Sequence, residues 1–217
     1  NSAWISISLF GSLPFLFSNL NLNFIDAFFE STSGITTTGS TIIKNLEEVS
    51  YGILLWRALL QWLGGIGIIV MAVAILPMLS IGGMQLFKTE SYETPDKIIP
   101  RAAIFASGIS IVYIVLTSTW AFMLWLAGMP IFDSITHAMT TLATGGYSTK
   151  SESLGAFNSV NIEMIIVFGM IVGSLPFIHY LSILKNGWKN LINDQQVKWF
   201  LLILFFLISI VTFNLYI

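Results

Sequence analysis

Long apolar runs are the feature of this sequence that most restricts its fold. Runs of about 18 residues or more, the length that crosses the hydrocarbon core of a bilayer, lie at 51–81, 102–127, 160–184 and 198–217, and a shorter run lies at 4–20. Only 9% of the 217 residues are charged, against about 25% in soluble domains. Because a surface so poor in charge is tolerated in lipid, the sequence predicts an all-α polytopic membrane protein.

The composition also excludes several classes of function. The net charge is −2 and Lys and Arg form no cluster, which argues against a nucleic-acid partner. The chain has no cysteine, so thiolate chemistry is absent. Arg57 is almost the only ionisable residue within the full spans, so the facing carboxylates or Ser/His set of an intramembrane protease are missing. We therefore expect neither an enzyme nor an organic cofactor.

The few basic residues predict an orientation in the membrane. Lys and Arg are enriched in cytoplasmic loops. Two segments, after the runs at 51–81 and 160–184, hold six of the basic residues, whereas the Thr/Gly-rich segments at 31–50 and 144–159 hold only Lys44 and Lys150. The six are Lys88, Lys97, Arg101, Lys185, Lys189 and Lys198. The Thr/Gly-rich segments are therefore expected to face outside.

Two short helix-forming segments connect spans that begin and end on this outer side. The segments are 24–34 (FIDAFFESTSG) and 131–144 (IFDSITHAMTTLAT). The first would measure about 16 Å at 1.5 Å per residue, roughly half the hydrocarbon core. Such a helix enters the membrane and returns without crossing it, so the sequence predicts two re-entrant half-helices.

The same arrangement of elements occurs twice in the chain. Span, half-helix, Thr/Gly turn and span are followed by a second set, with the turns at 37–40 (TTGS) and 144–147 (TGGY). Gly39 and Gly146 are equivalent in this alignment, and Asp26 and Asp133 precede their respective glycines at the same spacing.

The repeat predicts a division of the chain into two pore units. The first covers 1–82, with a truncated first helix, a pore loop at 24–42 and a second helix at 51–82. The second covers 100–185, with a pore loop at 131–149. Cytoplasmic linkers are expected at 83–99 and 186–197, and 198–217 would open an incomplete third unit.

A half-helix followed by a Gly/Thr loop is suited to an ion pore. Irregular backbone at membrane depth persists only where it is buried in protein or lines a cavity. The carboxyl end of the half-helix directs negative partial charge toward a cation, and glycine permits dihedral angles that turn successive carbonyls to one axis. The turns carry no carboxylate at 35–41 or 142–149, which favours a carbonyl filter for a monovalent cation.

Three other polar residues near the half-helices or within the spans need an explanation. Arg57 lies early in its span, and a membrane-embedded Arg is costly unless it is paired. Glu30 and Asp26, four residues apart on the first half-helix, are its candidate partners. Such a pair would brace the filter; the alternative is that Arg57 extends to the outer interface. His137 and His179 could bind metal or line a vestibule, but packing or hydrogen bonding is the simpler interpretation.

The loops and the helix between them resemble the TrkH/KtrB superfamily of potassium-uptake proteins. The resemblance rests on 34–42 (GITTTGSTI), 56–91 (WRALLQWLGGIGIIVMAVAILPMLSIGGMQLFKTES) and 136–149 (THAMTTLATGGYST). The blocks LQWLGGIGIIV and GGMQLF are nearly unbroken, which indicates the TrkH branch.

The resemblance implies a pore with four-fold pseudo-symmetry, in a bacterial inner membrane, that selects K⁺. Gly39 and Gly146 would be filter glycines, and the carbonyls of Thr37, Thr38, Thr144 and Gly145 would contact K⁺. It also implies a homodimer and a cytosolic nucleotide-binding partner, TrkA; coupling to H⁺ or Na⁺ stays open. Because family members are roughly twice as long, we expect a fragment with two of four repeats. The alternatives are a half-length subunit that dimerises to form a pore and a non-conducting scaffold.

Overall fold

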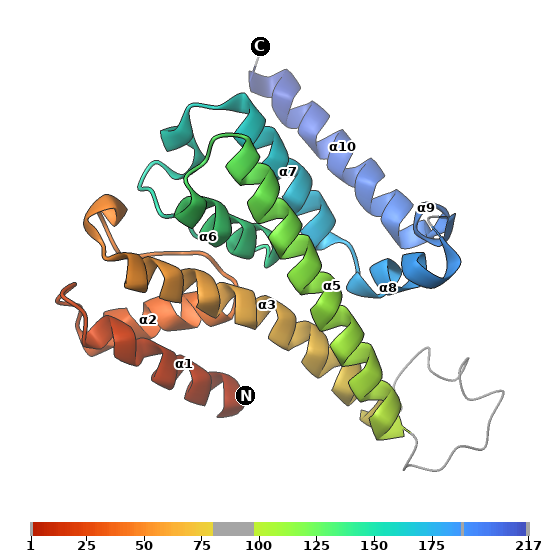
Figure 1. Cartoon of the computed structure of the whole chain (residues 1–217), viewed down its shortest axis with the longest axis horizontal. Helices are drawn as coiled ribbons and strands as arrows, with labels where there is room; N and C mark the ends of the chain where they lie inside the picture. Colours follow the sequence, from red (N-terminus) through yellow and green to blue (C-terminus); the bar gives the residue numbers. More distant parts are fainter. Residues whose placement is uncertain (1, 80–97, 188, 216–217) are drawn as a thin grey trace. The chain divides into compact units, whose positions relative to one another are not determined.

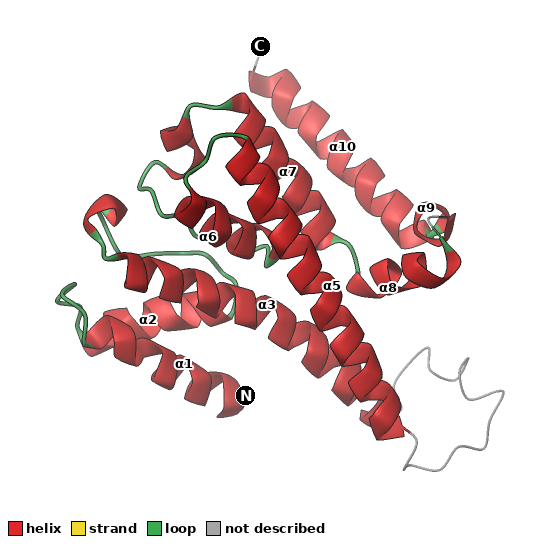
Figure 2. Cartoon of the chain, viewed as in Figure 1, coloured by secondary structure: helices red, strands yellow, loops and turns green. Residues whose placement is uncertain are grey.

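The computed structural model describes residues 2–79, 98–187 and 189–215, and these residues form helices and loops without a strand (Figure 2). The fold class is thus confirmed as all-α with repeated helix, half-helix and helix units. The helices are α1 Ser2–Leu16, α2 Phe24–Ile35, α3 Tyr51–Leu79, α5 Ile98–Leu126, α6 Ile131–Leu142, α7 Val160–Ser174, α8 Phe177–Asn186, α9 Lys189–Asn193 and α10 Gln195–Leu215. Short 3₁₀ turns occupy Leu46–Glu48 and Ser153–Phe157.

The chain divides into two compact units, Asn1–Ser174 and Leu175–Ile217. The division falls where α7 ends at Ser174 and α8 begins after Pro176. The apolar run at 160–184, which was predicted as one membrane span, is therefore interrupted at Pro176. Proline lacks the N–H of a helical bond and disfavours helical dihedrals at the residue before it. Residues 175–185 of the predicted second repeat accordingly belong to the second unit.

Both predicted half-helices are present as short helices of 12 residues, α2 and α6. The side chain of Asn23 caps α2 by accepting from the backbone N–H of Asp26 (2.9 Å). Pro130 precedes α6, where a missing N–H costs nothing. Twelve residues span about 18 Å, which is too short to cross a bilayer.

Within the first unit each half-helix lies among longer helices (Figure 1). α2 packs against α1 and α3, whereas α6 packs against α5, α3 and α7. α3 therefore contacts both half-helices and is the element that joins the two repeats.

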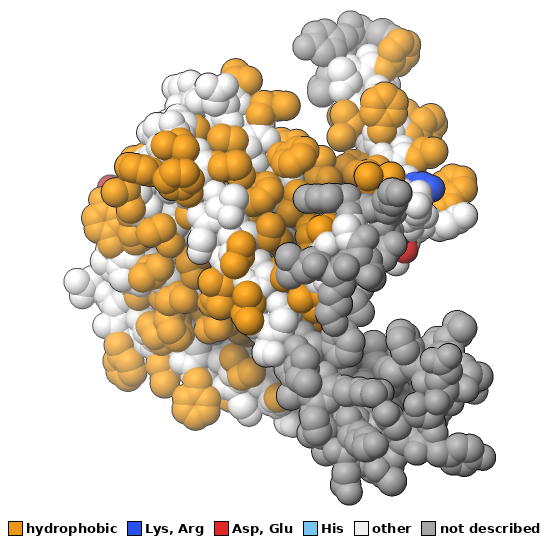
Figure 3. Space-filling model, turned by 45° about the vertical axis from the view of Figure 1, so that its right-hand side comes forward, with side chains coloured by type: hydrophobic (Ala, Val, Ile, Leu, Met, Phe, Trp, Pro, Cys, Tyr) orange, Lys and Arg blue, Asp and Glu red, His pale blue; other side chains and the backbone are white. Residues whose placement is uncertain are grey.

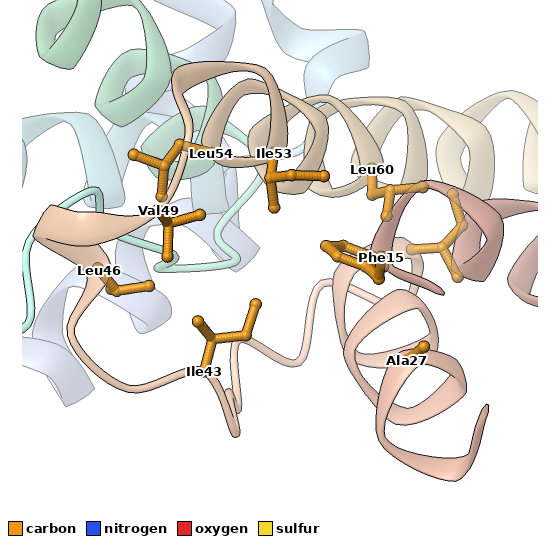
Figure 4. Packing of buried hydrophobic residues seen from close by; sticks show 9 residues of the cluster. Phe15, Ala27, Ile43, Leu46, Val49, Ile53, Leu54 and Leu60 are labelled. Atoms are coloured by element: carbon orange, nitrogen blue, oxygen red, sulfur yellow. The ribbon is translucent and has the colours of Figure 1, made fainter. Parts of the chain in front are cut away.

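A buried apolar cluster holds the segment that follows α2 (Figure 4). Figure 4 shows side chains from α1, α2, the segment after α2 and the start of α3 pointing toward one another. Its members are Phe15, Ala27, Ile35, Ile43, Leu46, Val49, Ile53, Leu54 and Leu60. Burying a large apolar side chain contributes about 1.5–3 kcal/mol, so this cluster fixes the path of the loop after α2.

The outer surface is apolar, as a lipid environment requires. Figure 3 shows hydrophobic side chains covering most of the visible described surface, with few charged ones. Two described helices, at Ala106–Leu126 and Gln195–Asn214, are long and apolar enough to cross a membrane, and Ser2–Leu16 and Val160–Ser174 are shorter apolar helices.

Two further boundaries can be compared with the sequence prediction. The linker expected at 83–99 lies, up to residue 97, outside the described residues. The linker expected at 186–197 contains α9, and α10 begins at Gln195, ahead of the predicted start of the third unit at 198.

Candidate functional site

The loop after α2, residues 36–42 and called loop 1 here, turns sharply back from the helix end. The N–H of Thr37 donates to Gly34 O (2.9 Å), and the N–H groups of Thr38 and Gly39 donate to Ser33 O (2.9 and 3.5 Å). Thr37 has φ +55° and Gly39 has φ +81°. The hydroxyl of Ser33 donates to Ser40 O (2.6 Å) and ties the far side of the turn to the helix.

The loop after α6, residues 143–149 and called loop 2 here, repeats these bonds at the equivalent positions of the second repeat. Thr144 N donates to Thr141 O (3.0 Å), while Gly145 N and Gly146 N donate to Thr140 O (2.9 and 3.4 Å). Thr144 has φ +53° and Gly146 has φ +81°. The hydroxyl of Thr140 donates to Tyr147 O (2.9 Å) as that of Ser33 does to Ser40 O.

These bonds leave the same carbonyl groups unused in each loop. Within the described part of the chain, the carbonyl oxygens of Thr37, Thr38, Thr144 and Gly145 accept no hydrogen bond. Each pair follows the carboxyl end of a short helix, where the helix dipole is negative. Both loops therefore present oxygen atoms that could bind a cation.

The two loops touch each other. A Cβ atom built on Gly39 would collide with the carbonyl oxygen of Gly145, whereas one built on Gly146 meets nothing within 4 Å. Gly39 thus packs against the neighbouring loop, and the equivalent side of Gly146 is open in this chain.

A buried ion pair supports loop 1. Arg57 Nε lies 2.8 Å from Glu30 Oε1, and both side chains are almost fully buried. The Glu30 carboxylate also accepts from the hydroxyl of Thr41 (2.9 and 3.0 Å) and from Ile42 N (3.1 Å). The sequence left Glu30 and Asp26 as alternative partners of Arg57, and the structure pairs Arg57 with Glu30.

Loop 2 is supported by a histidine and a carboxylate of its own half-helix in place of an ion pair. His137, the counterpart of Glu30 in the second repeat, contacts Ser148 Oγ through Nε2 (3.0 Å) and Asp133 O through Nδ1 (2.8 Å). The hydroxyl of Thr149 donates to the Asp133 carboxylate (2.6 Å). Hydrogen bonding thus accounts for His137, and the described residues hold no group of three or more potential metal ligands.

His179 lies in the second unit, where its Nε2 is 3.6 Å from Asp194 Oδ2. Asp26 lies in the first turn of α2, and its backbone N–H donates a hydrogen bond to the side chain of Asn23. Neither residue joins the contacts around loops 1 and 2 that are described above.

Sequence reasoning missed Gln61 and Tyr147. Gln61 Oε1 accepts from Tyr147 N (3.1 Å), and the Tyr147 hydroxyl donates to Glu30 O (3.0 Å) and Ser40 O (3.2 Å). The available signal was an amide in an otherwise apolar run, four residues and hence one turn after Arg57.

Repeated half-helices with free loop carbonyls define a membrane protein of the pore-loop class. Comparison with known proteins is more specific: a family model described as TrkH, cation transport protein, matches residues 1–217. The chain belongs to this family.

Named relatives cover almost the whole chain. This chain is 44% identical over 213 residues to the Trk system potassium uptake protein TrkI of Halomonas elongata, and the match covers 97% of this chain and 43% of that protein. It is 42% identical over 217 residues to TrkH of Salmonella typhimurium, covering 98% and 45%. The crystal structure of the potassium transporter TrkH from Vibrio parahaemolyticus matches with a TM-score of 0.82 and 40% identity, covering 95% and 42%. The chain thus spans somewhat less than half the length of these relatives.

Proposed function

We propose that this chain supplies two strands of the selectivity filter of a Trk-type potassium uptake pore. The observation that carries the proposal is the repeated loop backbone, with unused carbonyl groups at equivalent positions after the carboxyl end of each half-helix. Such carbonyls can replace the water around K⁺, and the left-handed glycines permit the turn. The proposed K⁺ filter residues are Thr37, Thr38, Gly39, Thr144, Gly145 and Gly146.

The ligand chemistry supports a monovalent cation. Carbonyl and hydroxyl groups are hard oxygen donors, and rings of carboxylates are the alternative found in other cation pores. The Glu30 carboxylate is engaged by Arg57, Thr41 and Ile42 N, so its charge is neutralised within the protein. The named relatives are potassium uptake proteins, which supports K⁺ as the transported ion, in a transporter and not an enzyme.

Arg57 and Glu30 are proposed to brace loop 1 at the filter. Arg57 Nη1 also donates to Ser148 O in loop 2 (3.0 Å). A buried charge that loses its partner destabilises the fold by about 3–5 kcal/mol, so the pair would hold both loops in one conformation.

Two strands do not surround an ion, so the proposal includes further assembly. We propose that two more repeats complete the ring, which fits the share of the relatives that this chain covers. By family resemblance we propose a homodimer, a TrkA-like nucleotide-binding partner and a bacterial inner membrane. The distribution of Lys and Arg supports loops 1 and 2 facing outside.

The test is potassium uptake by the complete gene product in a bacterium that lacks its own uptake systems. We expect Gly39→Ala and Gly146→Ala each to reduce growth on limiting K⁺ and the preference for K⁺ over Na⁺. Gly52→Ala and Gly155→Ala are matched controls, because no heavy atom lies within 4 Å of a Cβ at either site. Unaltered uptake and ion preference in both filter variants would reject the filter and favour a scaffold.

A further inference from the structure

Gln61 places its side-chain amide between the two loops. It is a fully buried polar residue of α3 (0% exposed), one turn after Arg57. Because the N–H of Tyr147 requires an acceptor, the bond of 3.1 Å fixes the amide with Oε1 toward loop 2. Nε2 then lies 3.7 Å from the position of a Cβ on Gly39 in loop 1.

This amide explains a difference between the two turns. A Cβ on Gly145 would collide with the Gln61 amide, whereas the equivalent residue of loop 1 is Thr38. The Gln61 side chain therefore occupies the space that a side chain at Gly145 would need. Loop 2 lies directly on α3, a helix of the other repeat.

Tyr147 makes the reverse connection, from loop 2 to loop 1. Its hydroxyl lies 3.2 Å from Ser40 O, the carbonyl of its own counterpart in loop 1, and 3.0 Å from Glu30 O. Its ring lies beneath the guanidinium group of Arg57, with Cζ 4.1 Å from the ring centroid. A cation is attracted to the face of an aromatic ring, so this contact holds the ring in position as well.

The second helix of the second repeat, α7, has no amide at the position that matches Gln61 of α3. Ile35 and Leu142 are the last residues of the two half-helices and are equivalent in the repeat. Gly64 of α3 lies against Ile35 O, and Gly173 of α7 lies against Leu142 O. Aligning Gly64 with Gly173 pairs Gln61 with Met170, which is 53% exposed. The polar link therefore occurs at the junction of loops 1 and 2, and α7 carries a methionine at the matching position.

We infer that Gln61 and Tyr147 are positioning residues that set the spacing of the first two filter strands and so contribute to the preference for K⁺ over Na⁺. The inference rests on the proposed function. Ion selectivity is a difference between two binding free energies. A buried N–H left without an acceptor is unfavourable, so loss of the Gln61 bond would let loop 2 move. In a filter, such a shift changes the distances from the carbonyls to the ion.

The test uses Gln61→Met, which places the residue of the second repeat at this position, and Tyr147→Phe, which keeps the ring beneath Arg57. In the complete gene product we expect each to lower the K⁺ over Na⁺ preference by about fivefold or more. The double variant should lose more than either single change, because Gln61→Met breaks the bond from Tyr147 N whereas Tyr147→Phe breaks the bonds of the Tyr147 hydroxyl. If Gln61→Met prevents folding, Tyr147→Phe decides the question.

Matched controls separate positioning from stability. Tyr113→Phe removes a hydroxyl that donates to Trp62 O (3.2 Å) between α3 and α5, and Met170→Gln adds an amide to α7. Both should keep the ion preference. A lowered melting temperature with unchanged ion preference in Gln61→Met and Tyr147→Phe would overturn the inference. If Gly39→Ala and Gly146→Ala change the preference in the same assay, the filter itself stands; if they do not, the proposed function fails first.

Discussion

Loops 1 and 2 share a backbone and differ in what supports it. The turns after α2 and α6 have the same three backbone bonds and the same left-handed residues. Loop 1 depends on a buried ion pair, whereas loop 2 depends on a histidine, a hydroxyl and a carboxylate of its own half-helix. The difference indicates that the carbonyl geometry is the common feature and that unlike side chains can hold it.

The largest expected effect comes from breaking the buried ion pair that supports loop 1. Arg57→Met leaves Glu30 buried without its cation and should destabilise the protein by about 3–5 kcal/mol. The double variant Arg57→Met/Glu30→Gln should cost less, since no unpaired charge remains. Chemical or thermal unfolding in detergent measures both changes.

The matched position in the second repeat is Ile166, which is buried and pairs with Arg57 when Gly64 is aligned with Gly173. Ile166→Met should cost less than about 1.5 kcal/mol. If Arg57→Met/Glu30→Gln is as unstable as Arg57→Met alone, the result would contradict the importance of the ion pair.

The next effect tests whether the loops are equivalent in the complete protein. Both glycines have φ +81°, and alanine there costs about 1–2 kcal/mol in strain. Gly39→Ala adds a collision with Gly145 O, giving a total of about 2–5 kcal/mol. If a third strand lies beside Gly146, then Gly146→Ala should cost the same. A loss at Gly146 that is smaller by more than about 1 kcal/mol would show that its side is open.

A smaller effect is expected from the histidine that replaces Glu30 in the second repeat. His137→Phe keeps an aromatic ring and removes the bonds to Ser148 Oγ and Asp133 O. Ser148 Oγ still accepts from Lys150 N and Asp133 O from the Thr136 hydroxyl, so loss of the two bonds should cost about 0.5–1.5 kcal/mol each, measured by the same unfolding assay. Zn²⁺ or a chelator should not change the stability of the unsubstituted protein. A zinc-dependent rise would contradict the hydrogen-bonding role.

The smallest effect concerns a link between the segments that follow loops 1 and 2. The hydroxyl and N–H of Ser151 donate to the exposed Glu47 carboxylate (2.6 and 2.8 Å) and lower the pKa of Glu47 to about 2, from an ordinary value of 4.5. Because the folded-state pKa is depressed, this stabilisation is present above pH 4.5 and is lost as the pH falls toward 2.

Ser151→Ala should remove most of that link. The difference in melting temperature between this variant and the unsubstituted protein should therefore be largest near neutral pH and shrink between pH 4.5 and 2. A difference that stays constant over this range would show that Glu47 does not contribute.

The half-helices were predictable because they depend on local signals. The expected segments 24–34 and 131–144 correspond to Phe24–Ile35 and Ile131–Leu142. Length, apolar pattern and flanking turns decide such helices. The equivalence of Gly39 and Gly146 was also predictable, since a repeat at a fixed offset places both in the same backbone conformation.

The contacts between repeats could not be predicted from the sequence. Gln61 and Tyr147 are 86 residues apart, and their meeting depends on how α3 packs against α6. Pro176 predicts a kink in the run at 160–184, but the apolar Leu175 and Phe177 give no sign that the helix ends there. The choice of Glu30 over Asp26 depends on which helix face turns toward α3, which a spacing of four residues leaves open.

In the proposed pore, the free carbonyls of loops 1 and 2 bind the transported ion. Crystals of the complete gene product grown in Rb⁺, an X-ray-visible substitute for K⁺, test this binding directly. We predict anomalous density in contact with the carbonyl oxygens of Thr37, Thr38, Thr144 and Gly145. Well-ordered loops without Rb⁺ density at these oxygens, in a protein that transports Rb⁺, would contradict the account.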